Sequence, residues 1–225
     1  MRMRTICQSF LPAASLVLLL ACGGAATAPG PQAAPASSGF TYQDPSGSGW
    51  ILQKNLASSD THLILDVIGP VGTKGRGIGF NLQSDGTVAF AKLSAAGYVR
   101  DTGVFKLQST FANYPVEPTL LAGGVKKNGT LLTVGIFQKD RYWPAQDLGQ
   151  AVCQIAIDFD PAKTAALPPG TVIPLTITKA KAIPAFIGDM PADPTDPNAD
   201  WNSVAYYYSA SLVPVQISVG TLTTK

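Results

Sequence analysis

Residues 76–93 read RGIGFNLQSDGTVAFAKL and contain two strand patterns with a turn signal between them. In the first of these patterns, three apolar side chains alternate with glycine, asparagine or glutamine: Ile78, Phe80 and Leu82. This period of two is typical of a strand that buries one face. Asp85-Gly86 supplies the positive φ of a tight hairpin turn, so Thr87–Leu93 is expected to return as the second strand. These residues predict an antiparallel β-hairpin.

Similar period-two segments recur from Trp50 onward, separated by glycine, proline, asparagine and aspartate, and no window shows a convincing helical period. The sequence Lys126-Lys127-Asn128-Gly129 predicts a type I′ turn that joins two of them. One helical turn is expected within Pro161–Leu167. We predict an all-β fold, an antiparallel two-sheet β-sandwich. Its further strands are expected at His62–Ile68, Thr102–Leu107, Thr119–Val125, Thr130–Gln138, Ala151–Phe159, Val172–Lys179 and Leu212–Leu222.

The order of four segments resembles the opening of a cohesin-like domain: Leu63–Val67, Gly77–Leu82, Asp85 and Val88–Phe90. In that family one strand is followed by a G-x-x-F-x-L strand and then by a short segment leading to the next strand. The resemblance covers about 61–222 and implies a jelly-roll sandwich. It also implies a non-catalytic protein-interaction or scaffold module, which dockerins bind in cellulosomes. It identifies no partner-facing residue in this chain.

The N-terminus reads as a secretory signal peptide, residues 1–21. Arg2 and Arg4 precede an apolar stretch from Phe10 to Ala21, which at about twelve residues is too short to span a bilayer. The stretch ends in Leu19-Leu20-Ala21-Cys22, which resembles the lipobox of bacterial lipoproteins. The resemblance implies cleavage before Cys22 and a diacylglyceryl thioether on its sulfur.

An ordinary secretory signal, cleaved after Ala26-Thr27-Ala28, is the alternative to a lipobox. With a lipobox, Gly23 stands where aspartate would retain an enterobacterial lipoprotein in the inner membrane. The resemblance therefore implies the outer membrane. Anchoring by several acyl chains is effectively permanent and needs no transmembrane helix.

Residues 22–48 are rich in alanine, proline, glycine and serine and nearly free of charge, which predicts a disordered tether. Phe40 and Tyr42 are its only aromatic residues, and we expect them to dock on the domain or to join its first strand. Residues 49–225 are predicted to form the single β-sandwich domain.

Composition excludes several classes of function. Removal of Arg2 and Arg4 with the signal reduces the 16 basic residues to 14, against 14 acidic ones, so no field attracts nucleic acid. His62 is the only histidine and Glu117 the only glutamate, which excludes histidine metal clusters, Ser-His-Asp triads and paired-glutamate glycosidase sites. Cys153 lies on an apolar strand face and is interpreted as a small core residue.

The stretch 189–202 contains four aspartates and is the only candidate for a metal site. Oxygen-bearing residues two apart can converge on a calcium ion. The candidate ligands are Asp193, Asp196, Asn198 and Asp200. Trp201 stands where an EF-hand needs glycine, so only a different kind of calcium loop fits. The alternative is a solvated loop whose aspartates initiate turns before proline. No other cofactor is expected.

Aromatic residues next to polar ones are candidate ligand contacts: Tyr142, Trp143 and Trp201. Such rings can stack on sugar faces or anchor a protein partner. The alternative for Trp143 is that it caps one end of the sandwich.

These observations favour a lipid-anchored, non-enzymatic module that presents a β-sandwich to a protein or polysaccharide partner at the cell envelope, with the domain at the cell surface. The alternative is a periplasm-facing lipoprotein that serves the structure or assembly of an outer-membrane complex. A hydrolase would need two aspartates about 5–10 Å apart in a cleft. Its candidate residues are Asp158, Asp160 and Asp200.

Overall fold

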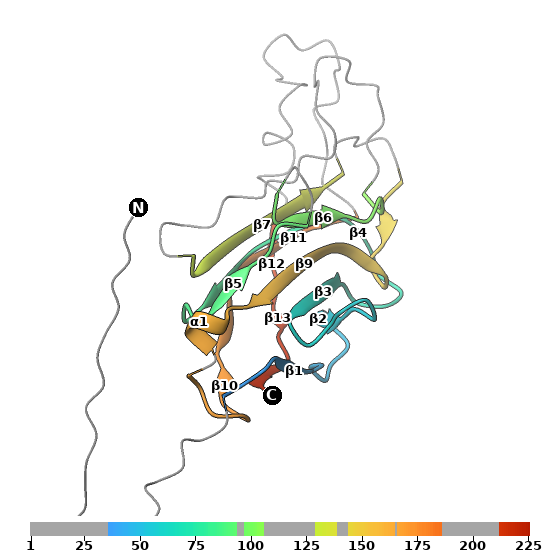
Figure 1. Ribbon diagram of the computed structural model, residues 1–225. Helices are drawn as coiled ribbons and strands as arrows, with labels where there is room; N and C mark the ends of the chain where they lie inside the picture. The colour runs from blue at the N-terminus through green and yellow to red at the C-terminus, as the bar shows by residue number, and fades with distance from the viewer. Residues whose placement is uncertain (1–35, 94–96, 106–128, 139–143, 165, 186–211) are drawn as a thin grey trace, which may run out of the picture. The chain divides into compact units, whose positions relative to one another are not determined.

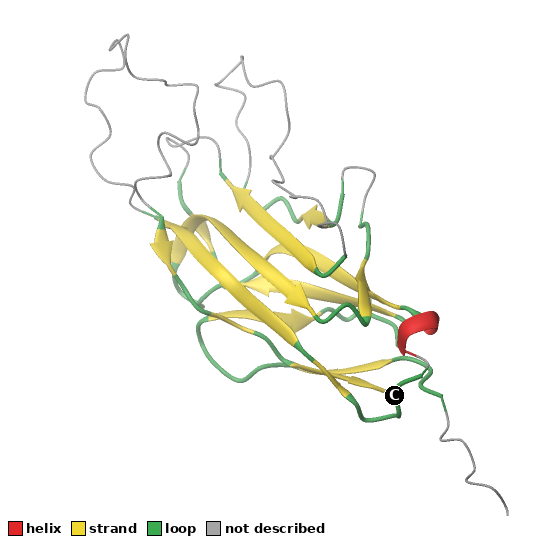
Figure 2. Ribbon diagram, turned by 90° about the vertical axis from the view of Figure 1, so that its left-hand side faces the viewer, coloured by secondary structure: helices red, strands yellow, loops and turns green. Residues whose placement is uncertain are grey.

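A computed structural model describes residues 36–93, 97–105, 129–138, 144–164, 166–185 and 212–225. These residues form strands arranged in three sheets and one short helix, α1 (Pro161–Thr164) (Figures 1 and 2). The predicted all-β fold and the predicted helical turn are confirmed. None of the described residues forms a helix that is long and apolar enough to cross a bilayer.

The first large sheet has the order β13-β2-β3-β9-β5, with β6 also paired to β9. All its pairs are antiparallel except β13 with β2, which run parallel. Its strands are β2 (Trp50–Lys54), β3 (His62–Ile68), β5 (Val88–Phe90), β6 (Val99–Asp101), β9 (Ala151–Phe159) and β13 (Ile217–Ser218). The two predicted strands at 62–68 and 151–159 are confirmed in full.

The second large sheet has the order β12-β11-β4-β7, with β8 paired to the beginning of β4. All its pairs are antiparallel. Its strands are β4 (Lys74–Ser84), β7 (Leu131–Phe137), β8 (Gln146–Asp147), β11 (Leu175–Pro184) and β12 (Val213–Pro214). β4 and β11 each have a neighbour on both edges, so they are the two interior strands of this sheet.

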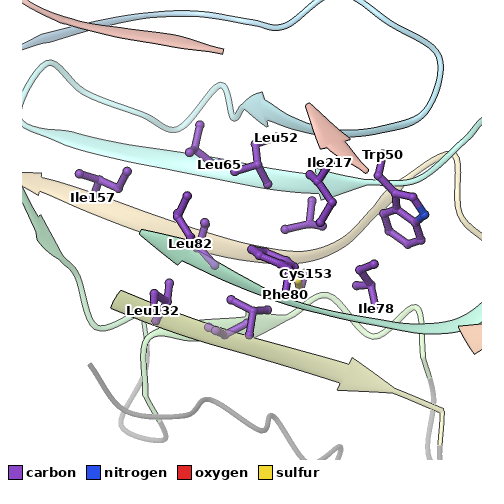
Figure 3. Packing of buried hydrophobic residues seen from close by; sticks show 14 of the residues in the cluster. Trp50, Leu52, Leu65, Ile78, Phe80, Leu82, Leu132, Cys153, Ile157 and Ile217 are labelled. Atoms are coloured by element: carbon purple, nitrogen blue, oxygen red, sulfur yellow. The ribbon is translucent and has the colours of Figure 1, made fainter. Parts of the chain in front are cut away.

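The core lies between the two large sheets, where their apolar side chains point toward one another (Figure 3). The even-numbered residues of β4 and β7 supply one side: Ile78, Phe80, Leu82, Leu132, Val134 and Ile136. The other side includes Leu52, Leu65, Val67, Ile155 and Ile157. Burying one such side chain contributes about 1.5–3 kcal/mol. Cys153 lies in this core, and burial raises the pKa of its thiol.

The predicted hairpin of residues 76–93 is wrong in its pairing. Both strands form, and Gly86 has the expected positive φ of 93°. However, β5 pairs with β9 in the first sheet, whereas β4 lies in the second. Because β7 and β11 already occupy both edges of β4, the chain must leave for the other sheet at the Asp85-Gly86 turn.

The predicted strand at 212–222 is also corrected, because the chain there contributes to all three sheets. After β12 and β13 it forms β14 (Thr221–Thr224), which pairs with β1 (Phe40–Gln43) and β10 (Val172–Ile173).

The folded region begins before the expected boundary at residue 49. Phe40 and Tyr42 of β1 are buried, and β1 pairs antiparallel with β14. The expectation that these two aromatic residues join the domain is confirmed. The boundary predicted from composition was wrong because the burial of these two rings orders a segment whose average composition is polar.

Candidate binding face

The second large sheet turns one face to the core and one face outward. The outward positions are set by the period of two, and the register places them in rows across β11, β4 and β7. We call this surface the polar face. Its residues are Thr176, Thr178 and Lys181 on β11, Gly79, Asn81 and Gln83 on β4, and Leu131, Thr133 and Gly135 on β7.

No side chain projects from the centre of the polar face, because two glycines, Gly79 and Gly135, lie opposite each other there. A Cβ atom added at Gly79 would lie 3.4 Å from the nearest heavy atom, the carbonyl oxygen of Val134. This is ordinary contact, so the half-buried backbone is not crowded here. A partner could therefore approach the strands closely at this point.

Next to the glycines runs a row of short polar side chains, Thr178, Asn81 and Thr133, aligned by the strand register. Within the described part of the chain, none of these three side chains makes a hydrogen bond to the protein. Thr178 is exposed and the other two are half-buried. Their donors and acceptors are available to a partner in exchange for water.

A bulge in β11 sets the charge of the polar face. The register shifts between Thr178 and Lys181, and Lys179 adopts a positive φ of 55°. Lys179 and Lys181 are both exposed, and neither forms an ion pair with a described residue. The described positions of the polar face include no acidic residue. The β11 side of this surface is therefore positive.

The outward face of the first large sheet is different, because its polar side chains bind one another. The carboxylate of Asp66 accepts hydrogen bonds from Asn55 Nδ2 and Gln154 Nε2, both at 2.8 Å. Nδ1 of His62 lies 2.6 Å from Oδ1 of Asp158. These groups are already paired, which leaves less for a ligand to gain.

The two described aspartates of the hydrolase hypothesis each have a partner within the protein. Asp158 is engaged by His62, and Asp160 caps α1, with its Oδ1 accepting from Ala162 N at 3.0 Å. A groove lined by residues 43–46 and 218–221 holds one carboxylate, that of Asp44, which accepts from Lys54 N at 2.7 Å. The third hydrolase candidate, Asp200, lies outside the described residues.

All the other site residues expected from the sequence lie outside the described residues. They are Cys22, Tyr142, Trp143, Asp193, Asp196, Asn198, Asp200 and Trp201. Among the residues that are described, no group of three or more histidines, cysteines or acidic residues could hold a metal ion. The calcium, aromatic and lipidation expectations therefore stay predictions.

Cohesin structures are among the solved structures to which this chain is similar. The sixth cohesin of Acetivibrio cellulolyticus scaffoldin B, solved with a Cel5 dockerin, is 9% identical, with a TM-score of 0.44 over 78% of this chain and 97% of the cohesin. The CaCohA2 chain of a complex with CaDoc0917 is 8% identical, with a TM-score of 0.41 over 77% and 94%.

The cohesin of OlpC from Clostridium thermocellum, solved with Doc435, is 7% identical, with a TM-score of 0.39 over 67% and 85%. No protein-family profile matches this chain, and no curated protein does. These similarities name no partner for this protein.

The sequence predicted some residues of the polar face but not others. The alternation in β4 already predicted that Gly79 and Asn81 face outward. Lys181 was missed because the predicted strand ended at Lys179, whereas β11 continues to Pro184. The alternation Lys179-Ala180-Lys181-Ala182 was the available signal.

Proposed function

We propose that this protein is a lipid-anchored, non-enzymatic module that binds a protein partner at the cell envelope through its polar face. The observation that carries the proposal is the row of unpaired hydroxyl and amide groups beside two half-buried glycines that carry no side chain. An open sheet face of this kind suits an extended or helical protein segment better than a small molecule, which needs a concave pocket.

The partner's contact segment is acidic. Lys181 on the polar face and Lys179 in the bulge beside it make this side positive, and no described acidic residue of that face balances them. Carboxylates opposite these lysines would raise the association rate and set the orientation of the partner.

The anchor of this module is the thioether-linked lipid on Cys22 that the sequence predicts. Its site of action is the outer membrane, with the domain at the cell surface. The alternative orientation, toward the periplasm, would make the same face a contact within an envelope complex.

The binding proposal is tested with a photo-crosslinking residue in place of Thr133 on intact cells, followed by identification and purification of the crosslinked protein. The same residue in place of Gln53, which is exposed on the first large sheet, is the control. We expect a discrete product from position 133. Crosslinking to the same protein from position 53 alone would contradict the proposal.

With the purified partner, Lys181→Glu should weaken binding about tenfold, or about 1.4 kcal/mol, by placing like charges across the interface. The matched control is Lys92→Glu, because Lys92 is also exposed but lies after β5 in the other sheet. An equal loss of affinity in both variants would show that general charge, and not the polar face, governs binding.

Orientation is tested by treating intact and lysed cells with proteinase K and following the domain by immunoblot, with a periplasmic protein as control. Loss of the domain in intact cells is expected for the cell surface. Survival until lysis would establish the periplasmic alternative.

A further inference from the structure

One end of the sandwich gathers the beginning of the described chain, its last residue and the loop between β2 and β3. Phe40 N donates to Asp60 O at 2.7 Å, and Ser38 N donates to Lys225 O at 3.0 Å. Nζ of Lys225 lies 2.7 Å from Oδ2 of Asp60. We call residues 36–39, 55–61 and 225 the tether end, because the chain toward Cys22 leaves the domain here.

The chain between the predicted lipid anchor and the tether end is short. Fourteen residue steps separate Cys22 from Ala36. They span at most about 50 Å when fully extended and about 20 Å on average for a fully flexible chain, a value that the three prolines increase. The strand β4 alone, with 11 residues, is about 36 Å long. Because the average tether is shorter than β4, it keeps the tether end closer to the membrane than the opposite end of the domain.

The tether end presents an apolar side chain directly to solvent. Leu56 is 104% exposed at the tip of the loop between β2 and β3. The loop is an ordered turn, since Ser58 N donates to Asn55 O at 3.0 Å and Ala57 N donates to Asn55 Oδ1 at 2.8 Å. Asn55 is itself held by Asp66. The fold thus holds an apolar leucine side chain in contact with water. Transfer of this side chain into lipid would remove the unfavourable free energy of its hydration.

Two lysines near Leu56 are paired with aspartates, whereas the exposed Lys54 forms no ion pair with a described residue. Lys225 holds the pKa of the Asp60 carboxyl below its ordinary value through a hydrogen bond and the attraction of its charge. Lys163 lies 3.5 Å from Asp160, and the end of β9 is beside the loop, because Phe159 N donates to Thr61 O. The lysine–aspartate pairs suit a zwitterionic headgroup layer, and the one additional lysine adds attraction to lipid phosphates.

We propose that the tether end rests on the bilayer to which Cys22 is anchored, with Leu56 inserted at the boundary between headgroups and acyl chains. This inference rests on the proposed lipid anchor. This orientation keeps the beginning of β4 away from the membrane. Val71 and the attachment points of residues 139–143 and 186–211 lie at that end. The strands of the polar face then point away from the bilayer, and the face itself remains accessible to a partner.

The experiment uses the acylated full chain in vesicles of phosphatidylcholine and phosphatidylethanolamine. An environment-sensitive fluorophore is attached to Leu56→Cys or, as a matched control, to Val71→Cys. Val71 is 85% exposed and follows β3, whereas Leu56 precedes it, so about 23 Å of strand separates them. The buried Cys153 does not compete for the label.

Quenching by nitroxide lipids and flotation of the vesicles give the two readouts. We expect the protein to float and position 56 to be quenched several-fold more than position 71. Flotation with equal quenching, or with stronger quenching at 71, would overturn this inference and leave the anchor intact. A protein that does not float would overturn both.

A second variant tests whether Leu56 itself makes the contact. With the fluorophore at Ala57→Cys, replacing Leu56 by asparagine should reduce the quenching several-fold, because the apolar side chain that holds the loop at the lipid boundary is gone. Unchanged quenching would overturn the insertion of Leu56.

Discussion

At the scale of single residues, Tyr42 joins three parts of the chain through one hydroxyl group. The hydroxyl donates to Leu52 O at 2.9 Å and accepts from Gly220 N at 2.7 Å. Its ring is buried in the core. Tyr42 thereby ties β1 to β2 and to the turn that precedes β14.

Tyr42→Phe should lower the free energy of unfolding by about 1–3 kcal/mol, because it leaves the buried carbonyl of Leu52 and the half-buried amide of Gly220 without their partner. Urea unfolding followed by tryptophan fluorescence measures the change. A variant as stable as the parent would show that water replaces the hydroxyl.

The same residue predicts a pH dependence. Burial, opposed by the hydrogen bond from Gly220, raises the pKa of Tyr42 from 10.0 to about 12. The folded state therefore holds this proton more tightly than the unfolded chain. The resulting stabilisation is complete below pH 10 and is lost as the pH rises toward 12.

We expect the stability difference between the parent protein and Tyr42→Phe to shrink over this interval, because the other tyrosines titrate in both proteins. Urea midpoints at pH 8, 10, 11 and 12 measure it. A difference that stays constant up to pH 12 would contradict the assigned cause.

At the scale of elements, the strand β4 shows how two glycines in one strand have different roles. A Cβ atom at Gly77 would lie 2.6 Å from both Ile136 O and the Cβ of Phe137. At Gly79, two residues on, the nearest atom would be 3.4 Å away. Close packing against β7 requires glycine at position 77. At position 79 there is space for a Cβ atom, and glycine only leaves the polar face without a projecting side chain.

Gly77→Ala should therefore destabilise the protein by about 1–3 kcal/mol through overpacking. Gly79→Ala, the matched control, should change stability by less than about 1 kcal/mol. Chemical unfolding of both variants gives the comparison. Equal effects would mean that the two sites differ less in space than the structure shows.

At the scale of the whole molecule, the two ends of the domain close the fold together. β1 pairs with β14, so residues 40–43 and 221–224 form one small sheet with β10. The segment 40–43 is thus part of the domain and not only of the tether that leads to it.

Deleting residues 23–35 should leave the melting temperature unchanged, whereas deleting residues 23–43 should lower it by about 10 °C. The second deletion removes two buried aromatic side chains, worth about 1.5–3 kcal/mol each, and 1 kcal/mol shifts a domain of this size by about 2–4 °C. Calorimetry distinguishes them. Equal melting temperatures would return the boundary to residue 49.

The strands and the direction of their side chains could be predicted from adjacent residues, because both depend on a local period of two. The strand at 151–159, the inward Ile78, Phe80 and Leu82, and the outward Asn81 were all predicted in this way. Part of the candidate site was therefore visible from alternation alone.

Which strands are neighbours is settled only in three dimensions. The Asp85-Gly86 turn looks like a hairpin turn, yet β5 pairs with β9 because β7 and β11 occupy both edges of β4. The polar face needs β11 beside β4, although about ninety residues separate these strands along the chain. Strand pairing depends on competition for edges between distant segments, and a local pattern carries no information about that competition.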